Sequence, residues 1–314
     1  MAKILINDGI HPTGKEMLEK AGFEVNCNKI SQDDLTERLP EYDAICVRSA
    51  TKVREALIEN CPNLKVIGRG GVGLDNIDVD FAKSKGIAVV NTPAASSRSV
   101  AELAFGHMLS VARNLYKSNR HMPKDGTTEF KALKKSYSKG FELSGKTLGV
   151  IGLGRIGQEA IKIALGMGMK VVGVDPFAEE VSVDISIGDT QLTVPVNKVS
   201  MDEMLAQADI ITLHIPFTGT PVLSNSEFGK MKDGVILINA SRGGTVDEAA
   251  LLAALESDKV KAAGLDVFEN EPTPREELLQ HPNVSCTPHI GASTGEAQEN
   301  IGIELAEKLI SHLS

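Results

Sequence analysis

The fold of this chain is decided by the stretch KTLGVIGLGRIGQEAIKIALGMGMKVVGVD, residues 146–175. It opens with a short apolar run that predicts a buried strand, and continues into Gly152, Gly154 and Gly157 in the spacing G-x-G-x-x-G. Apolar residues at helical intervals follow, and a second apolar run ends in Asp175. The order strand, glycine turn, helix, strand and acid is typical of a dinucleotide-binding β-α-β unit.

The three glycines and the acid each fit a role in holding a dinucleotide. Gly152 would allow a tight turn, Gly154 a close approach of the backbone to a pyrophosphate, and Gly157 close helix packing. The pyrophosphate would lie on the free N–H groups at the positive end of the helix dipole. Asp175 lies 18 residues beyond the last glycine, near the roughly 20 expected for an acid that bonds the ribose hydroxyls. No Arg or Lys directly follows it to hold a 2′-phosphate, so the sequence predicts NAD rather than NADP; a solvated carboxylate at a strand end is the alternative.

The rest of the chain alternates strand-like and helix-like segments. In 314 residues, this spacing predicts an α/β protein of two domains, each a doubly wound parallel sheet. A long helix is expected from a capping box at Ser99 to about Arg120, followed by a polar loop or arm over 121–145. Alternating residues over 181–196 predict a β-hairpin, and a helix over 296–312 closes the chain.

Composition argues against several classes of partner. The net charge of −9 and the pI near 5.4 argue against a surface for nucleic acid or an anionic membrane. No apolar run approaches the ~20 residues that cross a bilayer. The four cysteines show no C-x-x-C spacing and fit reduced cysteines of a cytoplasmic protein, and we expect no metal site. An anionic substrate would therefore need a local basic pocket.

Three polar side chains follow predicted strands in the half of the chain that carries the glycine turn: Arg242, Glu271 and His289. The carboxyl ends of parallel strands form one edge of a sheet, where ligands of such folds bind. Oxidation of a 2-hydroxy acid needs a base for the hydroxyl proton, and His289 would titrate near neutrality. Glu271 could orient the imidazole and raise its pKa, and Arg242 could bind the substrate carboxylate in a bidentate pair. Each also has another interpretation, as a loop histidine, a helix-capping arginine or a surface acid, and spacing does not decide whether the three converge.

Seven motifs spread over the chain resemble those of a known family. They are VRSATKV (47–53), GRGGVGLDNID (68–78), SVAELAFGHML (99–109), GKTLGVIGLGRIG (145–157), NASRGGTVDE (239–248), GLDVFENEP (264–272) and TPHIGAST (287–294). Together they resemble the D-isomer-specific 2-hydroxyacid dehydrogenases. By this resemblance Arg242 binds substrate, Glu271 tunes the histidine, and His289 donates and accepts the proton.

The resemblance, with the strand ends identified above, also implies which residues hold the ligands. The expected NAD contacts are Val72, Gly152, Gly154, Arg155, Ile156, Gly157, Asp175, His214, Ile215, Pro216, Ala240, Ser241, Arg242, Asp266, His289, Ile290, Gly291 and Ala292. A small anionic 2-hydroxy or 2-oxo acid is expected to contact Arg48, Ser49, Arg69, Gly70, Gly71, Arg242 and His289.

A discontinuous domain layout follows from the same resemblance. A smaller, flavodoxin-like substrate domain would comprise residues 1–97 plus 291–314, and a Rossmann NAD-binding domain would comprise residues 98–290. Members of the family are typically homodimers that use the long helix and the neighbouring arm. Because the chain ends soon after the closing helix, we expect no C-terminal regulatory domain and no feedback inhibition by serine.

Within the family, the chain looks most like the members that oxidise 3-phospho-D-glycerate to 3-phosphohydroxypyruvate in serine biosynthesis. Arg48, Lys52 and Arg69 are candidates to pair with the phosphate, together with Lys135 of the partner subunit. Surface salt bridging is the alternative for these cations. The alternatives for the activity are a glyoxylate, hydroxypyruvate or D-lactate reductase, and an NAD-sensing binding protein like the transcriptional co-repressors of this fold.

Overall fold

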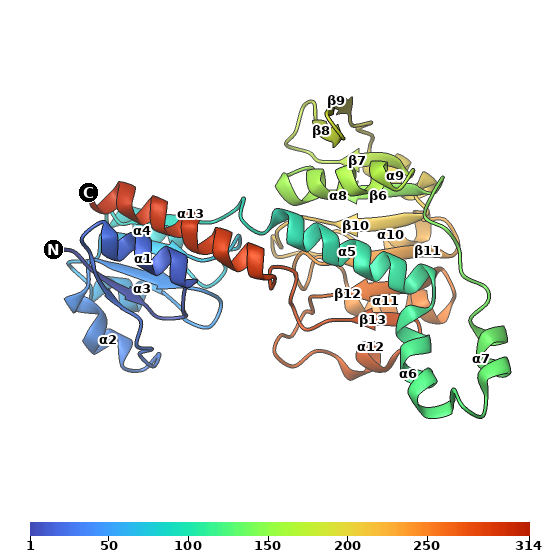
Figure 1. Ribbon diagram of the computed structural model, residues 1–314, viewed down its shortest axis with the longest axis horizontal. Helices are drawn as coiled ribbons and strands as arrows, with labels where there is room; N and C mark the ends of the chain where they lie inside the picture. Colours follow the sequence, from blue (N-terminus) through green and yellow to red (C-terminus); the bar gives the residue numbers. More distant parts are fainter. The chain divides into compact units, whose positions relative to one another are not determined.

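The computed structural model describes all residues, 1–314, and the chain divides into two compact units. The first unit is Met1–Ser99 with Ala292–Ser314, and the second is Val100–Gly291. Each unit is built around a parallel sheet with helices on both faces (Figure 1). The predicted α/β class with two doubly wound parallel sheets is confirmed. The boundaries expected from the sequence lie within two residues of these divisions.

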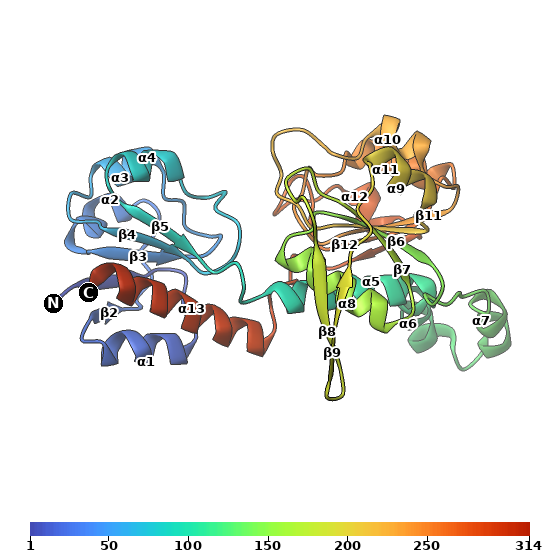
Figure 2. The ribbon, with the colours of Figure 1, turned by 90° about the horizontal axis from the view of Figure 1, so that it is seen from above.

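The first unit is a five-stranded sheet between two layers of helices. Its elements are β1 (Lys3–Ile6), α1 (Pro12–Lys20), β2 (Glu24–Asn26), α2 (Leu35–Arg38), the 3-10 helix η1 (Leu39–Glu41), β3 (Ala44–Val47), α3 (Glu55–Glu59), β4 (Val66–Arg69), α4 (Val79–Ser84), β5 (Ala88–Asn91) and α13 (Gly295–Leu313). The strand order is β2-β1-β3-β4-β5, and α2, α3 and α4 cover one face while α1 and α13 cover the other (Figure 2). All four residues of the central strand β3 are buried, because a sheet covered on both faces needs continuous apolar strands.

Helix α13 ties the C-terminal end of the chain to this sheet by packing beside α1 (Figure 2). A Cβ atom built on Gly14 would lie 2.4 Å from the carbonyl oxygen of Gly302, so only glycine allows the two backbones to come this close. Leu305 and Leu309 are buried against the sheet. None of the helices, α13 included, has both the length and the apolar character that crossing a membrane requires.

The second unit is a six-stranded parallel sheet with an added hairpin. Its elements are α5 (Ser97–Ala112), α6 (Leu115–Asp125), α7 (Phe130–Ser136), β6 (Thr147–Ile151), α8 (Arg155–Gly166), β7 (Lys170–Val174), β8 (Ser182–Ile187), β9 (Thr190–Pro195), α9 (Met201–Gln207), β10 (Ile210–Leu213), α10 (Asn225–Lys230), β11 (Val235–Asn239), α11 (Glu248–Glu256), β12 (Val260–Leu265), α12 (Glu276–Gln280) and β13 (Val284–Cys286). The strand order is β13-β12-β11-β10-β6-β7. Helices α9 to α12 cover one face, and α5 and α8 cover the other (Figure 2).

The order of these strands reverses at β6. The chain leaves β6 through the glycine turn, crosses by α8 to β7 on one side, and later returns to β10 on the other side of β6. Ile151, at the end of β6, pairs with Val174 of β7 and with Leu213 of β10, so the three strand ends are level. A reversal of this kind is the switch point at which open α/β sheets bind ligands.

The predicted hairpin is present as β8 and β9, joined by a two-residue turn at Gly188 and Asp189. It lies where a Rossmann sheet would continue beyond β7. There the only further pairing is one parallel bridge, between Gly173 and Lys198.

The prediction of one long helix, capped at Ser99 and running to about Arg120, is wrong. The helix begins at Ser97, so Ser99 lies inside α5 instead of capping it, and α5 stops at Ala112. Asn114 then adopts the left-handed φ of 54°, which asparagine tolerates better than most residues, and α6 starts anew beyond it. The stretch expected as a loop or arm contains the end of α6 and all of α7, neither of which has a buried residue. Without a buried apolar stripe, these helices lack the pattern by which the sequence could reveal them.

Candidate active site

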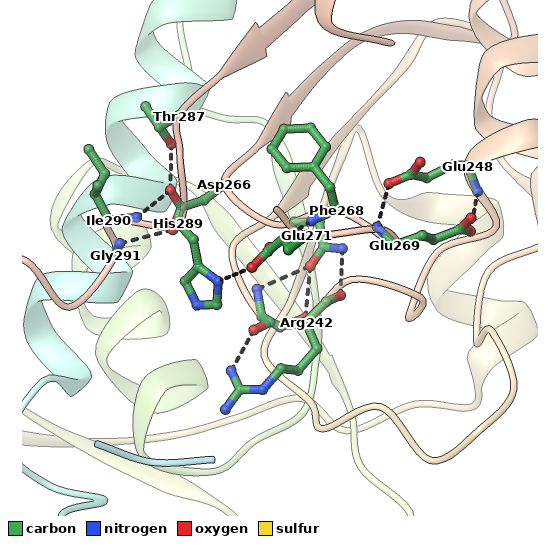
Figure 3. A network of polar contacts seen from close by, with 12 residues as sticks. Arg242, Glu248, Asp266, Phe268, Glu269, Glu271, Thr287, His289, Ile290 and Gly291 are labelled. Carbon is green, nitrogen blue, oxygen red and sulfur yellow. Dashed lines mark hydrogen bonds and ion pairs between the residues drawn. The ribbon is translucent and has the colours of Figure 1, made fainter. Parts of the chain in front are cut away.

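The three candidate catalytic side chains lie at the carboxyl ends of three adjacent strands. Arg242 follows β11, Glu271 follows β12 and His289 follows β13, and these strands are neighbours in the sheet. Figure 3 shows the imidazole and the carboxylate in contact, with the arginine close by. The structure therefore brings together the three residues that the sequence could only place separately.

Glu271 holds and tunes the imidazole of His289. Its Oε2 lies 2.7 Å from Nδ1 of His289, and its Oε1 accepts the backbone N–H of Phe268 at 3.0 Å. The hydrogen bond to Glu271 raises the pKa of His289 and outweighs the opposing effect of burial. Burial alone would raise the pKa of Glu271, but the bonds from His289 and Phe268 lower it below its ordinary value. The geometry therefore favours the pair with both members charged.

Arg242 lies in a loop that is held in place by hydrogen bonds to its own backbone carbonyl. The carbonyl oxygen of Arg242 accepts bonds from Asn239 Nδ2 at 3.2 Å and from Thr245 Oγ1 at 2.7 Å. Its Nη1 donates to the carbonyl of Ser241 at 2.7 Å. The guanidinium charge acts on both members of the pair, lowering the pKa of Glu271 and opposing the rise at His289. A bidentate donor so close to the imidazole can bind a carboxylate beside the atom that exchanges a proton.

The backbone of His289 is held by Asp266, which is 1% exposed. The His289 N–H donates to the carbonyl of Asp266 at 2.8 Å. The next two N–H groups, of Ile290 and Gly291, donate to its carboxylate at 2.8 and 2.9 Å (Figure 3). His289 itself has a left-handed φ of 54°. Asp266 therefore fixes a turn that a histidine adopts only at some cost.

The glycine turn has the shape that a dinucleotide pyrophosphate requires. Gly152 has a φ of 92°, and a Cβ atom on it would lie 2.5 Å from the carbonyl oxygen of His214. A Cβ on Gly157 would lie 2.0 Å from the carbonyl oxygen of Gly152. Gly154, in contrast, has no atom within 4 Å of its Cβ position. Helix α8 begins at Arg155, followed by Ile156, and no side chain caps its N-terminus. The turn thus leaves an open approach to free backbone donors, as an anion would need.

Asp175 directly follows β7 beside this turn and accepts several backbone hydrogen bonds. Its Oδ2 accepts the N–H of Leu153 at 2.9 Å, and its Oδ1 accepts those of Phe177 and Ala178 at 2.8 and 3.2 Å. Burial opposes ionisation, but these bonds hold the pKa of Asp175 below its ordinary value. A carboxylate oxygen can accept two bonds, so Oδ2 keeps capacity for a ribose hydroxyl. Its charge would repel a 2′-phosphate.

The expected NAD contacts after β10 and β11 surround the same strand ends. His214 is bonded through Nε2 to Thr212 Oγ1 at 3.1 Å, whereas its buried Nδ1 has no partner in the protein. Burial lowers the pKa of His214 to about 4, so the ring is neutral. Ile215 and Pro216 follow it, Ala240 is buried, and the Ser241 hydroxyl donates to Asn239 Oδ1 at 2.7 Å. An unpaired buried ring nitrogen beside the open glycine turn is free to pair with a polar group of a bound dinucleotide.

The other expected contacts belong to the first unit. Val72, Ala292 and the expected substrate residues Arg48, Ser49, Arg69, Gly70 and Gly71 all lie within Met1–Ser99 and Ala292–Ser314. Arg48 donates from Nη1 to Gln298 Oε1 at 2.6 Å and, with Gly70, lines a pocket of about 320 Å³ in this unit. Gly71 has a φ of 141°, and its N–H donates to Thr92 Oγ1 at 2.8 Å.

Several residues that shape the site were missed from the sequence. Asn239 and Thr245 organise the loop of Arg242, and Thr287 Oγ1 donates to Asp266 Oδ1 at 2.6 Å. For Asn239 and Thr287 the one signal was a polar side chain at or just beyond the end of an apolar strand, and Thr245 had none. His107 lies within one of the quoted motifs, but nothing in a helical pattern marks a buried histidine as part of a site.

Comparison with known proteins identifies relatives of this chain. Residues 105–291 match the family described as D-isomer specific 2-hydroxyacid dehydrogenase, NAD binding domain. The chain is 47% identical to a hydroxypyruvate reductase of Thermotoga maritima, over 99% of this chain and 98% of that protein. It is 44% identical to a D-3-phosphoglycerate dehydrogenase of Methanocaldococcus jannaschii over 98% of this chain, which spans only 57% of that protein. A solved NADPH-dependent glyoxylate/hydroxypyruvate reductase of Sinorhizobium meliloti superposes with a TM-score of 0.82 at 27% identity, over 100% of this chain and 95% of its own.

Proposed function

This chain belongs to the D-isomer-specific 2-hydroxyacid dehydrogenase family, with residues 105–291 as its NAD-binding domain, and we propose that it reduces a small unphosphorylated 2-oxo acid, hydroxypyruvate or glyoxylate, to the D-2-hydroxy acid. The observation that carries the proposal is the 2.7 Å contact between His289 and Glu271, with Arg242 beside it. Oxidation of 3-phospho-D-glycerate, expected from the sequence, becomes the alternative.

The state of His289 favours reduction. A hydride delivered to the 2-oxo carbon leaves an alkoxide, which must take up a proton from a nearby acid. Because Glu271 raises the pKa of His289, the imidazole is charged over a wider range of pH and has a proton to give. Arg242 would bind the substrate carboxylate and polarise the carbonyl oxygen.

The residues of the second unit fit NADH as the reductant. Bound NADH supplies the hydride. The turn of Gly152, Gly154 and Gly157 would hold its pyrophosphate, and Asp175 would bind the ribose hydroxyls and disfavour a 2′-phosphate.

Two observations support an unphosphorylated substrate. The chain is 47% identical to the hydroxypyruvate reductase, against 44% to the phosphoglycerate dehydrogenase. In addition, Arg48, the first of the candidate phosphate ligands, already donates to the neutral amide of Gln298.

The test is a comparison of NADH oxidation with hydroxypyruvate, glyoxylate and 3-phosphohydroxypyruvate. We expect kcat/KM for hydroxypyruvate to exceed that for the phosphorylated acid by at least about tenfold, which corresponds to about 1.4 kcal/mol of transition-state binding. Arg48→Gln provides the control, because it should lower turnover of the phosphorylated acid selectively only if Arg48 pairs with a phosphate. A preference for 3-phosphohydroxypyruvate that is lost in Arg48→Gln would reject the proposal and restore the alternative.

A homodimer formed through α6 and α7 is part of the proposal. His121 of α6 is hydrogen-bonded to the hydroxyl of Tyr137, the residue that directly follows α7, but neither helix contains a buried residue. Leu115, Met122 and Phe130 are 46%, 41% and 57% exposed. Exposed apolar side chains on helices that contain no buried residue fit an interface with a second copy.

A further inference from the structure

A buried chain of hydrogen bonds starts at His107 in α5 and leads toward the loop of His289. His107 is 3% exposed and lies against β12, where a Cβ atom on Gly264 would come within 2.5 Å of its own Cβ. Its Nδ1 is 3.0 Å from Ser285 Oγ, and its Nε2 is 2.9 Å from Thr287 Oγ1. Both ring nitrogens therefore have hydroxyl partners on or beside β13, and the glycine on β12 provides the space for the ring.

This series of hydrogen bonds ends at Asp266, the residue that fixes the turn at His289. Thr287 Oγ1 donates to Asp266 Oδ1 at 2.6 Å. Asp266 accepts the N–H groups of His289, Ile290 and Gly291, the first with its carbonyl and the other two with its carboxylate (Figure 3). A change at His107 would thus reach His289 through two residues, Thr287 and Asp266.

The donor and acceptor of each hydrogen bond between His107 and Asp266 can be assigned in one way only. Every group that contacts the Asp266 carboxylate is a donor, so the hydroxyl proton of Thr287 is committed to it. The oxygen of Thr287 must then accept from Nε2–H of His107, which leaves Nδ1 to accept from the hydroxyl of Ser285. Burial lowers the pKa of His107 and outweighs the raising effect of Asp266, so the ring is neutral. All partners are satisfied in the Nε2–H tautomer alone.

We propose that His107 is a positioning residue for the proton transfer: its Nε2–H holds Thr287 against Asp266, and Asp266 in turn fixes the turn that directs His289 toward Glu271. The inference rests on the proposed function for its kinetic consequence. His107 acts through Thr287 and Asp266, so its loss should weaken the contact of His289 with Glu271 without removing any group that transfers a proton or binds the dinucleotide.

The test compares two substitutions of His107 with a control on the same helix. His107→Leu removes both bonds, whereas His107→Gln offers an amide that can accept from Ser285 and donate to Thr287. Val111→Ala, one turn further along α5, loosens the hydrophobic core packed beneath this helix and leaves the hydrogen bonds of His107 in place. For hydroxypyruvate reduction, we expect His107→Leu to lower kcat at least about tenfold, with the KM for NADH within about twofold of the parent. In the pH profile of kcat, the decline at high pH should move to lower pH in His107→Leu. His107→Gln should recover most of the rate, and Val111→Ala should keep the pH profile of the parent.

Two NMR measurements test the inference without turnover. The ¹⁵N shifts of His107 in the parent should report a proton on Nε2, and titration of the His289 imidazole should give a lower pKa in His107→Leu than in the parent. Parent-like kinetics in His107→Leu, equal impairment in His107→Gln, or a proton on Nδ1 would each overturn it. If His107→Leu fails to fold, the tautomer of His107 in the parent and the kinetics of His107→Gln test the positioning role instead. If the parent reduces no 2-oxo acid, the proposed function fails, and the titration still decides the positioning role.

Discussion

Replacing Glu271 by Gln should shift the pH range in which the enzyme reduces a 2-oxo acid. The amide has nearly the size of the carboxylate and can still accept a bond from Nδ1 of His289, so the change removes mainly the charge. Without that charge, the pKa of His289 falls, and the imidazole loses its proton at lower pH.

The size of the effect follows from the separation and exposure of the pair. Two unit charges about 4 Å apart attract by about 1 kcal/mol at the permittivity of water and by about 4 kcal/mol at an effective permittivity of about 20. The side chains of His289 and Glu271 are 48% and 35% exposed, which places the pair toward the solvent-screened limit. An interaction of about 1–2 kcal/mol changes the proton affinity of the imidazole about fivefold to thirtyfold.

The assay is kcat/KM for NADH-dependent reduction of hydroxypyruvate from about pH 5.5 to about pH 9, a range that spans histidine titration. We expect Glu271→Gln to be about fivefold to thirtyfold slower than the parent at about pH 8 and to approach the parent at the acid end. Glu269→Gln is the matched control, because Glu269 accepts the backbone N–H of Glu248 at 2.9 Å and does not contact His289. A high-pH limb in Glu271→Gln that coincides with the parent limb would refute the tuning role, and so would an equal loss at every pH.

Three further predictions concern the cofactor site and the assembly. Gly154→Ala should keep the parent Tm, because its Cβ meets nothing in the protein, but should weaken NADH binding in a fluorescence titration. Gly157→Ala should lower stability by about 1–3 kcal/mol in thermal unfolding, because its Cβ would collide with the carbonyl oxygen of Gly152. Equal Tm values for the two variants would contradict this. Asp175→Ala should weaken NADH binding and narrow the preference over NADPH in parallel titrations, and an unchanged NADH/NADPH ratio would remove it from the ribose site. Phe130→Glu should convert a dimer into a monomer in light scattering without loss of Tm, and an unchanged mass would place the interface elsewhere.

The sequence predicted the parallel sheets and the side of the site, because both follow from local pattern. Strands covered on both faces must be apolar, and the carboxyl ends of neighbouring parallel strands share one edge, so Arg242, Glu271 and His289 could be placed at that edge from their positions alone. The glycine spacing likewise identified the turn before α8, because each glycine meets a steric demand that other residues fail.

The contacts inside the site could not be predicted, because they depend on single dihedral angles and on distant partners. The turn at His289 needs a φ of 54° and three bonds to Asp266, and neither leaves a trace in residue spacing. The same holds for the break at Asn114, where one left-handed residue ends a helix. His107 was missed because its role comes from hydroxyl groups about 180 residues away.

The most direct test of the account is the turnover of His289→Asn with hydroxypyruvate, measured beside its affinity for NADH. A positioned general acid contributes roughly 10²–10⁴-fold to rate, so we expect kcat to fall by at least about a hundredfold while NADH binds as tightly as to the parent. A variant that binds NADH normally and reduces hydroxypyruvate within about tenfold of the parent rate would contradict the assignment of His289 as the proton donor.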